Sequence, residues 1–305
     1  LCQERAMIVT QRTLLVFALL LVFGLARVPL ERSLETDLHA SGFRAGMALP
    51  DEATREQLGQ AGVVAMLGGF RSFLATAFEL RAVTSWYDAD YKSVEVFYNL
   101  ATQLQPREAG YWEMAAWMME SNAAFHYETP VAGETRLERR RRLEQMPVAR
   151  ERGKKFFADG LQFNPDDFAL NRAFAIYHDR REQNYCESAN YHLRAASIES
   201  RFSETRQAAY TMALCSGKEV EAYQLLRDIY QKTLATFGFL PESYVINCRY
   251  LEEFLKVPQA NRVPFRFDFK TFYELKLKKS DPKTATPKGQ LLMKRLESLR
   301  DLSAS

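Results

Sequence analysis

Cysteine, glycine and proline are all scarce in this chain of 305 residues. The 14 glycines and 11 prolines leave few turn signals, and the Ala, Leu, Glu, Arg and Gln of the middle of the chain favour helix over sheet. No two of the four cysteines form a CxxC pair, so neither a zinc site nor a disulfide framework is indicated. Cys186, Cys215 and Cys248 permit at most one bridge, and we expect them to be buried as small apolar residues instead.

A large charge imbalance is also absent. The chain has 41 basic and 38 acidic side chains, which give a formal net charge of +3 at pH 7. Because the two signs are mixed along the sequence, no global field would attract a polyanion. We therefore expect no nucleic-acid partner.

Motifs for catalysis and for metal binding are missing. The sequence contains no GxSxG elbow, kinase signature or Rossmann fingerprint, and its four histidines show no HExxH or HxH spacing. It therefore predicts a protein that is not an enzyme and that holds no cofactor and no metal. A divergent helical hydrolase acting on glycans remains the least favoured alternative, since it would need a carboxylate pair that sequence cannot place.

The stretch MLGGFRSF contains a glycine pair, Gly68-Gly69, before a helical pattern. The pair is not followed by the Lys and Ser/Thr of a phosphate-binding loop, so we interpret it as the turn that opens the first helix. Phe70 and Phe73 are then expected to face the core. Arg71 falls in the first turn, where the helix dipole disfavours a cation, which predicts a specific carboxylate partner.

The longest apolar run is TLLVFALLLVFGLA, the 14 uncharged residues from Thr13 to Ala26. As a helix it would span roughly 21 Å, short for a hydrocarbon core of about 30 Å. A transmembrane anchor over residues 13–30 and a signal-peptide core both fit the run, and a buried cytosolic helix is a third reading. The first two readings predict residues 1–12 in the cytoplasm and the rest on the extracytoplasmic, periplasmic side of the inner membrane.

The remaining chain is expected to consist of three parts. Residues 31–60 are charged and irregular and are typical of a stalk. Residues 61–260 show helical periodicity throughout, which predicts an all-α body. Within residues 261–305, phenylalanines alternate with charged residues from Phe265 to Phe269, a strand period that we interpret as an extended clip, followed by a capping helix.

One unit of the helical region matches the 34-residue tetratricopeptide spacing at every position. With Pro106 at the end, a small residue, two aromatics and an alanine fall where the pattern requires them: Ala82, Tyr91, Tyr98 and Ala101. Asp88 and Asp90 are interpreted as caps of the helix that begins at Tyr91. A second, partial unit contains Phe157 and Gly160 and ends at Pro165, and later units slip in register. An irregular helical bundle is the alternative to this degenerate α-solenoid of antiparallel helix pairs.

The same residues resemble a family of membrane-anchored, tetratricopeptide-like proteins of unknown function from planctomycete and verrucomicrobial bacteria. The shared stretches are Gly68-Gly69-Phe70-Arg71, Leu80-Arg81-Ala82, Leu104-Gln105-Pro106, Trp112-Glu113, Ala116-Trp117, Asn122 and Phe163-Asn164-Pro165. The resemblance covers roughly residues 66–200. It implies an N-terminal anchor and a helical-repeat body without catalytic residues.

Polar residues on the predicted helices are the candidates for an interaction site or for a buried polar network: Arg71, Arg81, Glu113 and Asn122. Because a buried charge must be compensated, those that point inwards should pair with one another. Trp112 and Trp117 are expected to fill the core. The run Arg139–Arg142 is interpreted as a solvated helix face, with anionic lipid or an acidic partner as the alternatives.

These observations together predict a membrane-tethered scaffold of the tetratricopeptide kind that binds a protein or peptide partner outside the cytoplasm. An accessory subunit of an envelope transport or polysaccharide machine, associated with integral-membrane partners, is the main alternative. The inference from fold to function is an analogy with other helical-repeat proteins.

Overall fold

The computed structural model describes residues 69–265, 271–272 and 286–299. The chain divides into two compact units after Phe70, and all the helices discussed below belong to the second. Every regular element in the described part is helical, which confirms the all-α prediction. The predicted anchor and stalk, and most of the predicted strand after Phe265, lie outside the described residues. Within those ranges, no helix is both long and apolar enough to cross a membrane.

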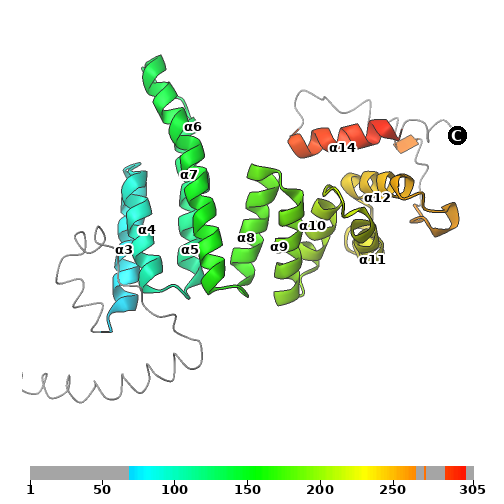
Figure 1. Cartoon of the computed structure of the whole chain (residues 1–305), viewed down its shortest axis with the longest axis horizontal. Helices are drawn as coiled ribbons and strands as arrows, with labels where there is room; N and C mark the ends of the chain where they lie inside the picture. The colour runs from blue at the N-terminus through cyan, green and yellow to red at the C-terminus, as the bar shows by residue number, and fades with distance from the viewer. Residues whose placement is uncertain (1–68, 266–270, 273–285, 300–305) are drawn as a thin grey trace, which may run out of the picture. The chain divides into compact units, whose positions relative to one another are not determined.

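From α3 to η3 the helices follow one another with short connections (Figure 1). In chain order they are α3 (Arg71–Tyr87), α4 (Tyr91–Leu104), α5 (Ala109–Trp117), η1 (Met118–Ala123), α6 (Ala124–Glu128), α7 (Arg136–Phe163), α8 (Phe168–Tyr177), η2 (His178–Glu182), α9 (Tyr185–Ile198), α10 (Phe202–Met212), α11 (Glu219–Phe237), α12 (Glu242–Phe254), η3 (Gln259–Asn261) and α14 (Pro287–Ser298). The segments η1 and η2 are π-helical and η3 is a 3₁₀ turn. Helices pack in successive pairs, α3 with α4, α5 with α7, α8 with α9 and α10 with α11.

Side chains at the helix starts explain several of these boundaries. Asp90 accepts a hydrogen bond from the Ser93 amide and caps α4, as predicted. Thr135 and Glu138 form a reciprocal capping box at the start of α7. Asp167 caps α8 through the Leu170 amide. Each cap satisfies an amide that the first turn of a helix leaves without an intrahelical partner.

The core positions marked by the tetratricopeptide spacing are buried. Ala82, Tyr91, Tyr98 and Ala101 all belong to the core around α3 and α4. The Pro106 carbonyl, just after α4, accepts hydrogen bonds from the indole of Trp112 and the side chain of Asn164. The two predicted unit ends are therefore joined directly.

Glycines allow α7 to approach α5 and η1 closely. A Cβ at Gly160 would stand 2.6 Å from Trp112 Cβ, and one at Gly153 would stand 2.6 Å from Glu120 Cβ. Phe157, between them in the sequence, is buried and stacks on Phe174. The predicted second unit thus has its small and aromatic positions in the core.

The prediction that Phe70 and Phe73 face the core is wrong. Phe70 is 60% exposed and Phe73 is 72% exposed. The buried face of α3 contains Ala75 and Ala82, whereas Phe73 and Leu80, seven residues apart, lie on another face of the helix.

A disulfide joins Cys186 and Cys215, so the expectation that both are free buried cysteines is wrong. Helices α9 and α10 pack against each other, and this brings the first turn of α9 within reach of the residues after α10. The two Cα atoms are 4.9 Å apart although the residues are 29 positions apart. Cys248 is free and buried, as expected.

The arginine run at the start of α7 is only partly a solvated face. Arg140 is exposed and pairs with Glu144, as the helical spacing predicts. Arg139 and Arg142 instead donate hydrogen bonds to backbone carbonyls at the end of α6, those of Glu128 and His126 among them. Guanidinium groups at the carboxyl end of a helix satisfy its last carbonyls and oppose its dipole.

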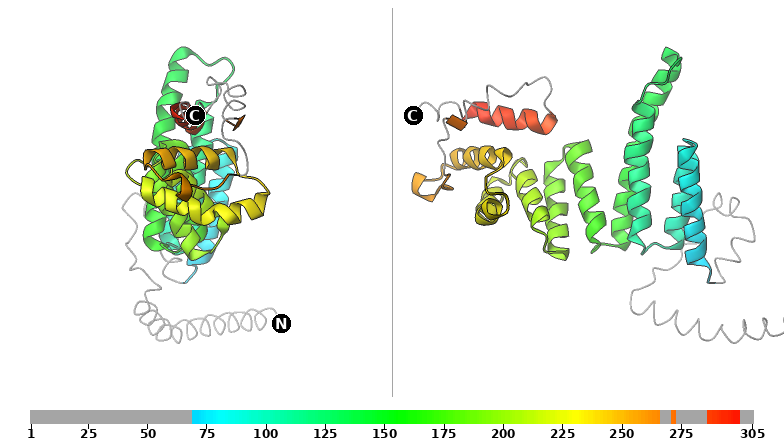
Figure 2. Two further views of the ribbon diagram at one scale, coloured as in Figure 1. Left: turned by 90° about the vertical axis from the view of Figure 1, so that its right-hand side faces the viewer. Right: turned by 180° about the vertical axis from the view of Figure 1, so that it is seen from behind.

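The chain after α12 packs back on the last helices. The Val263 amide and the Tyr223 hydroxyl both donate hydrogen bonds to the buried carboxylate of Glu252. Farther on, α14 packs against α12 with Leu296 fully buried (Figure 2). Val263 and α14 therefore cover the end of the helical body.

Candidate functional site

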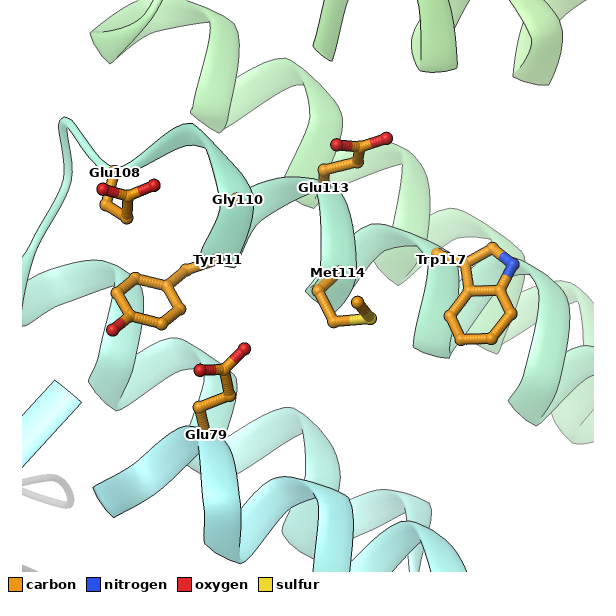
Figure 3. A pocket seen from close by; sticks show the side chains of 7 residues that line it. All are labelled: Glu79, Glu108, Gly110, Tyr111, Glu113, Met114 and Trp117. Atoms are coloured by element: carbon orange, nitrogen blue, oxygen red, sulfur yellow. The ribbon is translucent and has the colours of Figure 1, made fainter. Parts of the chain in front are cut away.

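Two neighbouring pockets lie on the described surface, and they are here called together the α3–α8 groove. The first has a volume of about 650 Å³ and is lined by Glu79, Glu108, Gly110, Tyr111, Glu113, Met114 and Trp117 (Figure 3). The second, of about 250 Å³, is lined by Glu113, Trp117, Glu120, Ser121, Phe157, Arg172, Ala173, Ile176, Tyr177, Arg180 and Arg181. Because the two pockets share Glu113 and Trp117, they are parts of one surface.

Helix α5 supplies the middle of the groove. Its core side contains Trp112 and Ala116, whereas Glu113, Met114 and Trp117 follow one another on the opposite side. Trp117 is 45% exposed, so the prediction that it fills the core is wrong. Ala116 faces the core, and the next position on an α-helix is rotated from it by about 100°, which turns Trp117 away from the core.

The first pocket is acidic. Glu79 extends from α3 towards α5, and Glu108 stands at the start of α5 beside Tyr111 (Figure 3). Neither these two carboxylates nor that of Glu113 has an ion-pair or hydrogen-bond partner among the residues the structure describes. Burial raises the pKa of Glu79, and repulsion from Glu108 raises it further. Burial also raises the pKa of Glu113, with Asp167 adding to the rise and Arg172 opposing it.

The second pocket is basic. Arg172 pairs with Glu204 at 3.2 Å and Arg181 pairs with Glu120 at 2.8 Å. Arg180 is exposed and has no ion-pair partner in the described ranges of the chain. The groove therefore changes sign along its length, from carboxylates near α3 to guanidinium groups near α8.

Two π-helical segments form part of the second pocket. Glu120 and Ser121 come from η1, and Arg180 and Arg181 come from η2. The ion pair of Arg181 with Glu120 joins the two segments directly. Single π-turns inside helices are rare and are frequent at functional sites, because they re-aim side chains that a regular helix would place elsewhere.

A buried polar pair positions one of the arginines of the second pocket. His192 Nδ1 and Glu204 Oε2 are 2.8 Å apart and both side chains are buried. Burial lowers the pKa of His192, although its hydrogen bond with Glu204 opposes that shift. Since Glu204 also accepts a hydrogen bond from Arg172, this cluster fixes one guanidinium of the groove.

The four residues predicted from sequence occupy different environments, and none of them is buried. Glu113 lies at the junction of the two pockets. Arg71 begins α3 and is half-buried, and Arg81 is exposed on the same helix. Asn122 lies in η1 and donates to the Met118 sulfur at 3.8 Å.

Sequence reasoning missed Glu79, Glu108 and Arg180 as groove residues. Nothing in the spacing of Glu79 and Glu108 indicates that α3 and α5 line one pocket. In the described part of the chain, no three His, Cys, Asp or Glu side chains form a group that could hold a metal ion.

No protein-family model matches this chain, and no curated protein matches it either. The resemblance to membrane-anchored tetratricopeptide-like proteins therefore stays a prediction from the sequence.

The uncompensated carboxylate of Glu79 should cost stability. A raised pKa means that the ionised form is disfavoured in the folded state, so its unfavourable contribution grows as pH rises from the ordinary value of 4.5 through the raised one. We expect Glu79→Gln to raise the melting temperature at pH 7 slightly and to have no such effect at pH 4. Thermal unfolding at both pH values tests this, with exposed Glu151→Gln on α7 as the control. A lower melting temperature for Glu79→Gln at pH 7 would contradict the account.

Proposed function

We propose that this protein is a non-catalytic, tetratricopeptide-like scaffold that binds an extended peptide segment of a partner protein in the α3–α8 groove. The main support for the proposal is the set of helices that line the groove. Most of its lining residues come from α3, α5 with η1, and α8 with η2, which are the first helices of three successive pairs, and Phe157 of α7 is the exception. Helical-repeat proteins commonly bind extended ligands on such a surface, made from corresponding helices of consecutive repeats.

The composition of the groove suits a peptide. Trp117 and Met114 are partly exposed on its wall, and tryptophan is among the residues that contribute most to protein interfaces. Carboxylates and guanidinium groups flank these apolar side chains and would give a bound segment direction and register. The first pocket alone lies within the volume range of specific ligand sites.

The proposed location is the extracytoplasmic side of a membrane, with the apolar run Thr13–Ala26 as the anchor. The Cys186–Cys215 disulfide supports this part of the proposal. Disulfides form and persist in oxidising compartments, whereas the cytosol keeps most thiols reduced.

Peptide selection tests the proposal. The full chain would be used to select binders from a phage-displayed library of random 12-residue peptides, and a selected peptide would be titrated by calorimetry. We expect Trp117→Ala to weaken binding by about 10- to 100-fold, since loss of a buried aromatic anchor typically costs 2 kcal/mol or more.

Phe125→Ala is the matched control, because Phe125 is an exposed aromatic on α6 outside the groove. We expect it to bind the peptide as the wild type does. If no selected peptide distinguishes Trp117→Ala from the wild type, the groove is not the peptide site and the proposal fails.

A further inference from the structure

We propose that the first pocket of the α3–α8 groove is the subsite for one lysine or arginine side chain of the bound peptide, an inference that rests on the function proposed above. The pocket combines an apolar wall with three carboxylates that form no ion pair with any residue the structure describes, and these two features together match a long basic side chain.

The charged side chains of the pocket are all acidic. Among the described residues, its lining contains Glu79, Glu108 and Glu113 and no basic side chain. Arg172 of the second pocket partly offsets the charge of Glu113. None of the three forms an ion pair with any residue that the structure describes, whereas the half-buried Glu95 pairs with Arg152 and the half-buried Glu120 with Arg181. Glu108 is exposed, but Glu79 and Glu113 are half-buried. A half-buried charge without an ion pair is costly, and a cationic group entering the pocket would offset that cost.

The region beneath Glu79 offers no compensation either. The Tyr98 side chain is fully buried, and its hydroxyl has no hydrogen-bond partner in the described part of the chain. Burial raises the pKa of Tyr98, and the nearby charge of Glu79 adds to the rise. Tyr98 therefore adds a buried polar group without a partner close to Glu79, and it supplies no positive charge.

The apolar wall selects among cations. Met114 lies between Glu79 and Trp117 along the pocket, and the Tyr111 ring stands beside Glu79 (Figure 3). Lysine and arginine pack their aliphatic stems on such surfaces while the charged head reaches a polar group. The exposed indole of Trp117 adds a face for a cation–π contact.

A metal ion fits the pocket less well than a side chain. A hard divalent cation needs several oxygen ligands within about 2 to 2.6 Å of one point. The carboxylates here do not form such a group, since the described residues contain no cluster able to hold a metal. Dispersed carboxylates around an apolar wall suit an extended organic cation.

The positive charge of the second pocket disfavours a basic side chain there, so we expect that side chain to bind in the first pocket. Arg180, which has no ion-pair partner among the described residues, and the paired Arg172 and Arg181 would repel a lysine or an arginine. A peptide with one basic residue is therefore expected to bind in a single direction along the groove.

The test begins with the composition of the selected peptides. Groove-dependent binders, defined as those that Trp117→Ala weakens, should contain Lys or Arg at one aligned position far more often than the starting library does. Replacing that residue by Gln in one synthetic peptide should weaken binding at least about tenfold, as expected for a charge-assisted contact.

The role of the carboxylates of the first pocket is tested with the double variant Glu79→Gln/Glu108→Gln. This double variant should weaken the basic peptide at least about tenfold and leave the affinity of its Gln version nearly unchanged. Glu151→Gln, which removes a carboxylate outside the groove, is the control and should bind both peptides as the wild type does.

The outcomes separate this inference from the proposed function. Two outcomes would overturn the lysine or arginine subsite but leave the proposed peptide groove intact. In the first, peptides that depend on Trp117 show no preference for a basic residue. In the second, the double variant binds the basic peptide as tightly as the wild type does. Binding of free N-acetyl-lysine-methylamide as strongly as the peptide would show a small-molecule amine site and would also overturn the inference. Absence of any Trp117-dependent peptide would end both.

Discussion

Breaking the Cys186–Cys215 disulfide is expected to lower the free energy of unfolding by about 3 to 4 kcal/mol. The bridge spans 29 positions, and cross-linking a loop of that length removes a large part of its chain entropy from the unfolded state. For a body of this size, the loss corresponds to a fall in melting temperature of about 6 to 15 °C. Thermal unfolding of the Cys186→Ser/Cys215→Ser variant measures it.

Reduction provides the control for that experiment. Dithiothreitol should lower the melting temperature of the wild type to that of the double variant and should leave the double variant unchanged. A double variant that melts within about 2 °C of the oxidised wild type would show that the bridge contributes little to stability.

Substituting Gly153 with valine is the second change with a large expected effect, a loss of about 3 kcal/mol or more. A Cβ at this position would stand 2.7 Å from the Glu120 amide nitrogen and 2.8 Å from the Ala116 carbonyl oxygen. Both are backbone atoms, so the neighbours cannot rotate away, and α7 must move off α5 and η1. Denaturant titration of the variant measures the change in unfolding free energy.

Alanine substitutions complete this series. Gly153→Ala should cost less than valine, because the gain in helix propensity, about 1 kcal/mol, partly offsets the clash. Gly110→Ala on α5 is the control, since its Cβ would meet nothing closer than a Glu108 carboxylate oxygen at 3.4 Å. If valine at Gly153 is tolerated as well as alanine at Gly110, the close approach of α7 is not a stabilising feature.

The periodicity of apolar residues was sufficient to predict the helices and two of their boundaries. Pro106 and Pro165 follow the ends of α4 and α7, because proline lacks an amide donor and disfavours helical backbone before it, although α7 continues through Pro147. Ala82 and Tyr98 are buried at the spacing that the repeat pattern requires. These features depend on local geometry, which the sequence expresses directly.

Features that depend on how helices meet could not be predicted. Trp112 and Trp117 are five residues apart on one apolar helix, and only the packing of α7 on α5 decides that the first is buried and the second exposed. Likewise, Cys186 and Cys215 come together only because α9 and α10 pack as a pair. Predicting the groove would require knowing that α3, α5 and α8 contribute to one surface.

Site-directed photo-crosslinking tests the central claim, that the α3–α8 groove binds an extended peptide. Benzoylphenylalanine would replace Met114 in the groove and, in a second protein, Val148, an exposed residue on α7 outside it. After irradiation with a selected peptide, mass spectrometry would map the linked residues. The account predicts a peptide adduct at position 114 and none at 148. Adducts at 148 alone, with the peptide still bound, would contradict it.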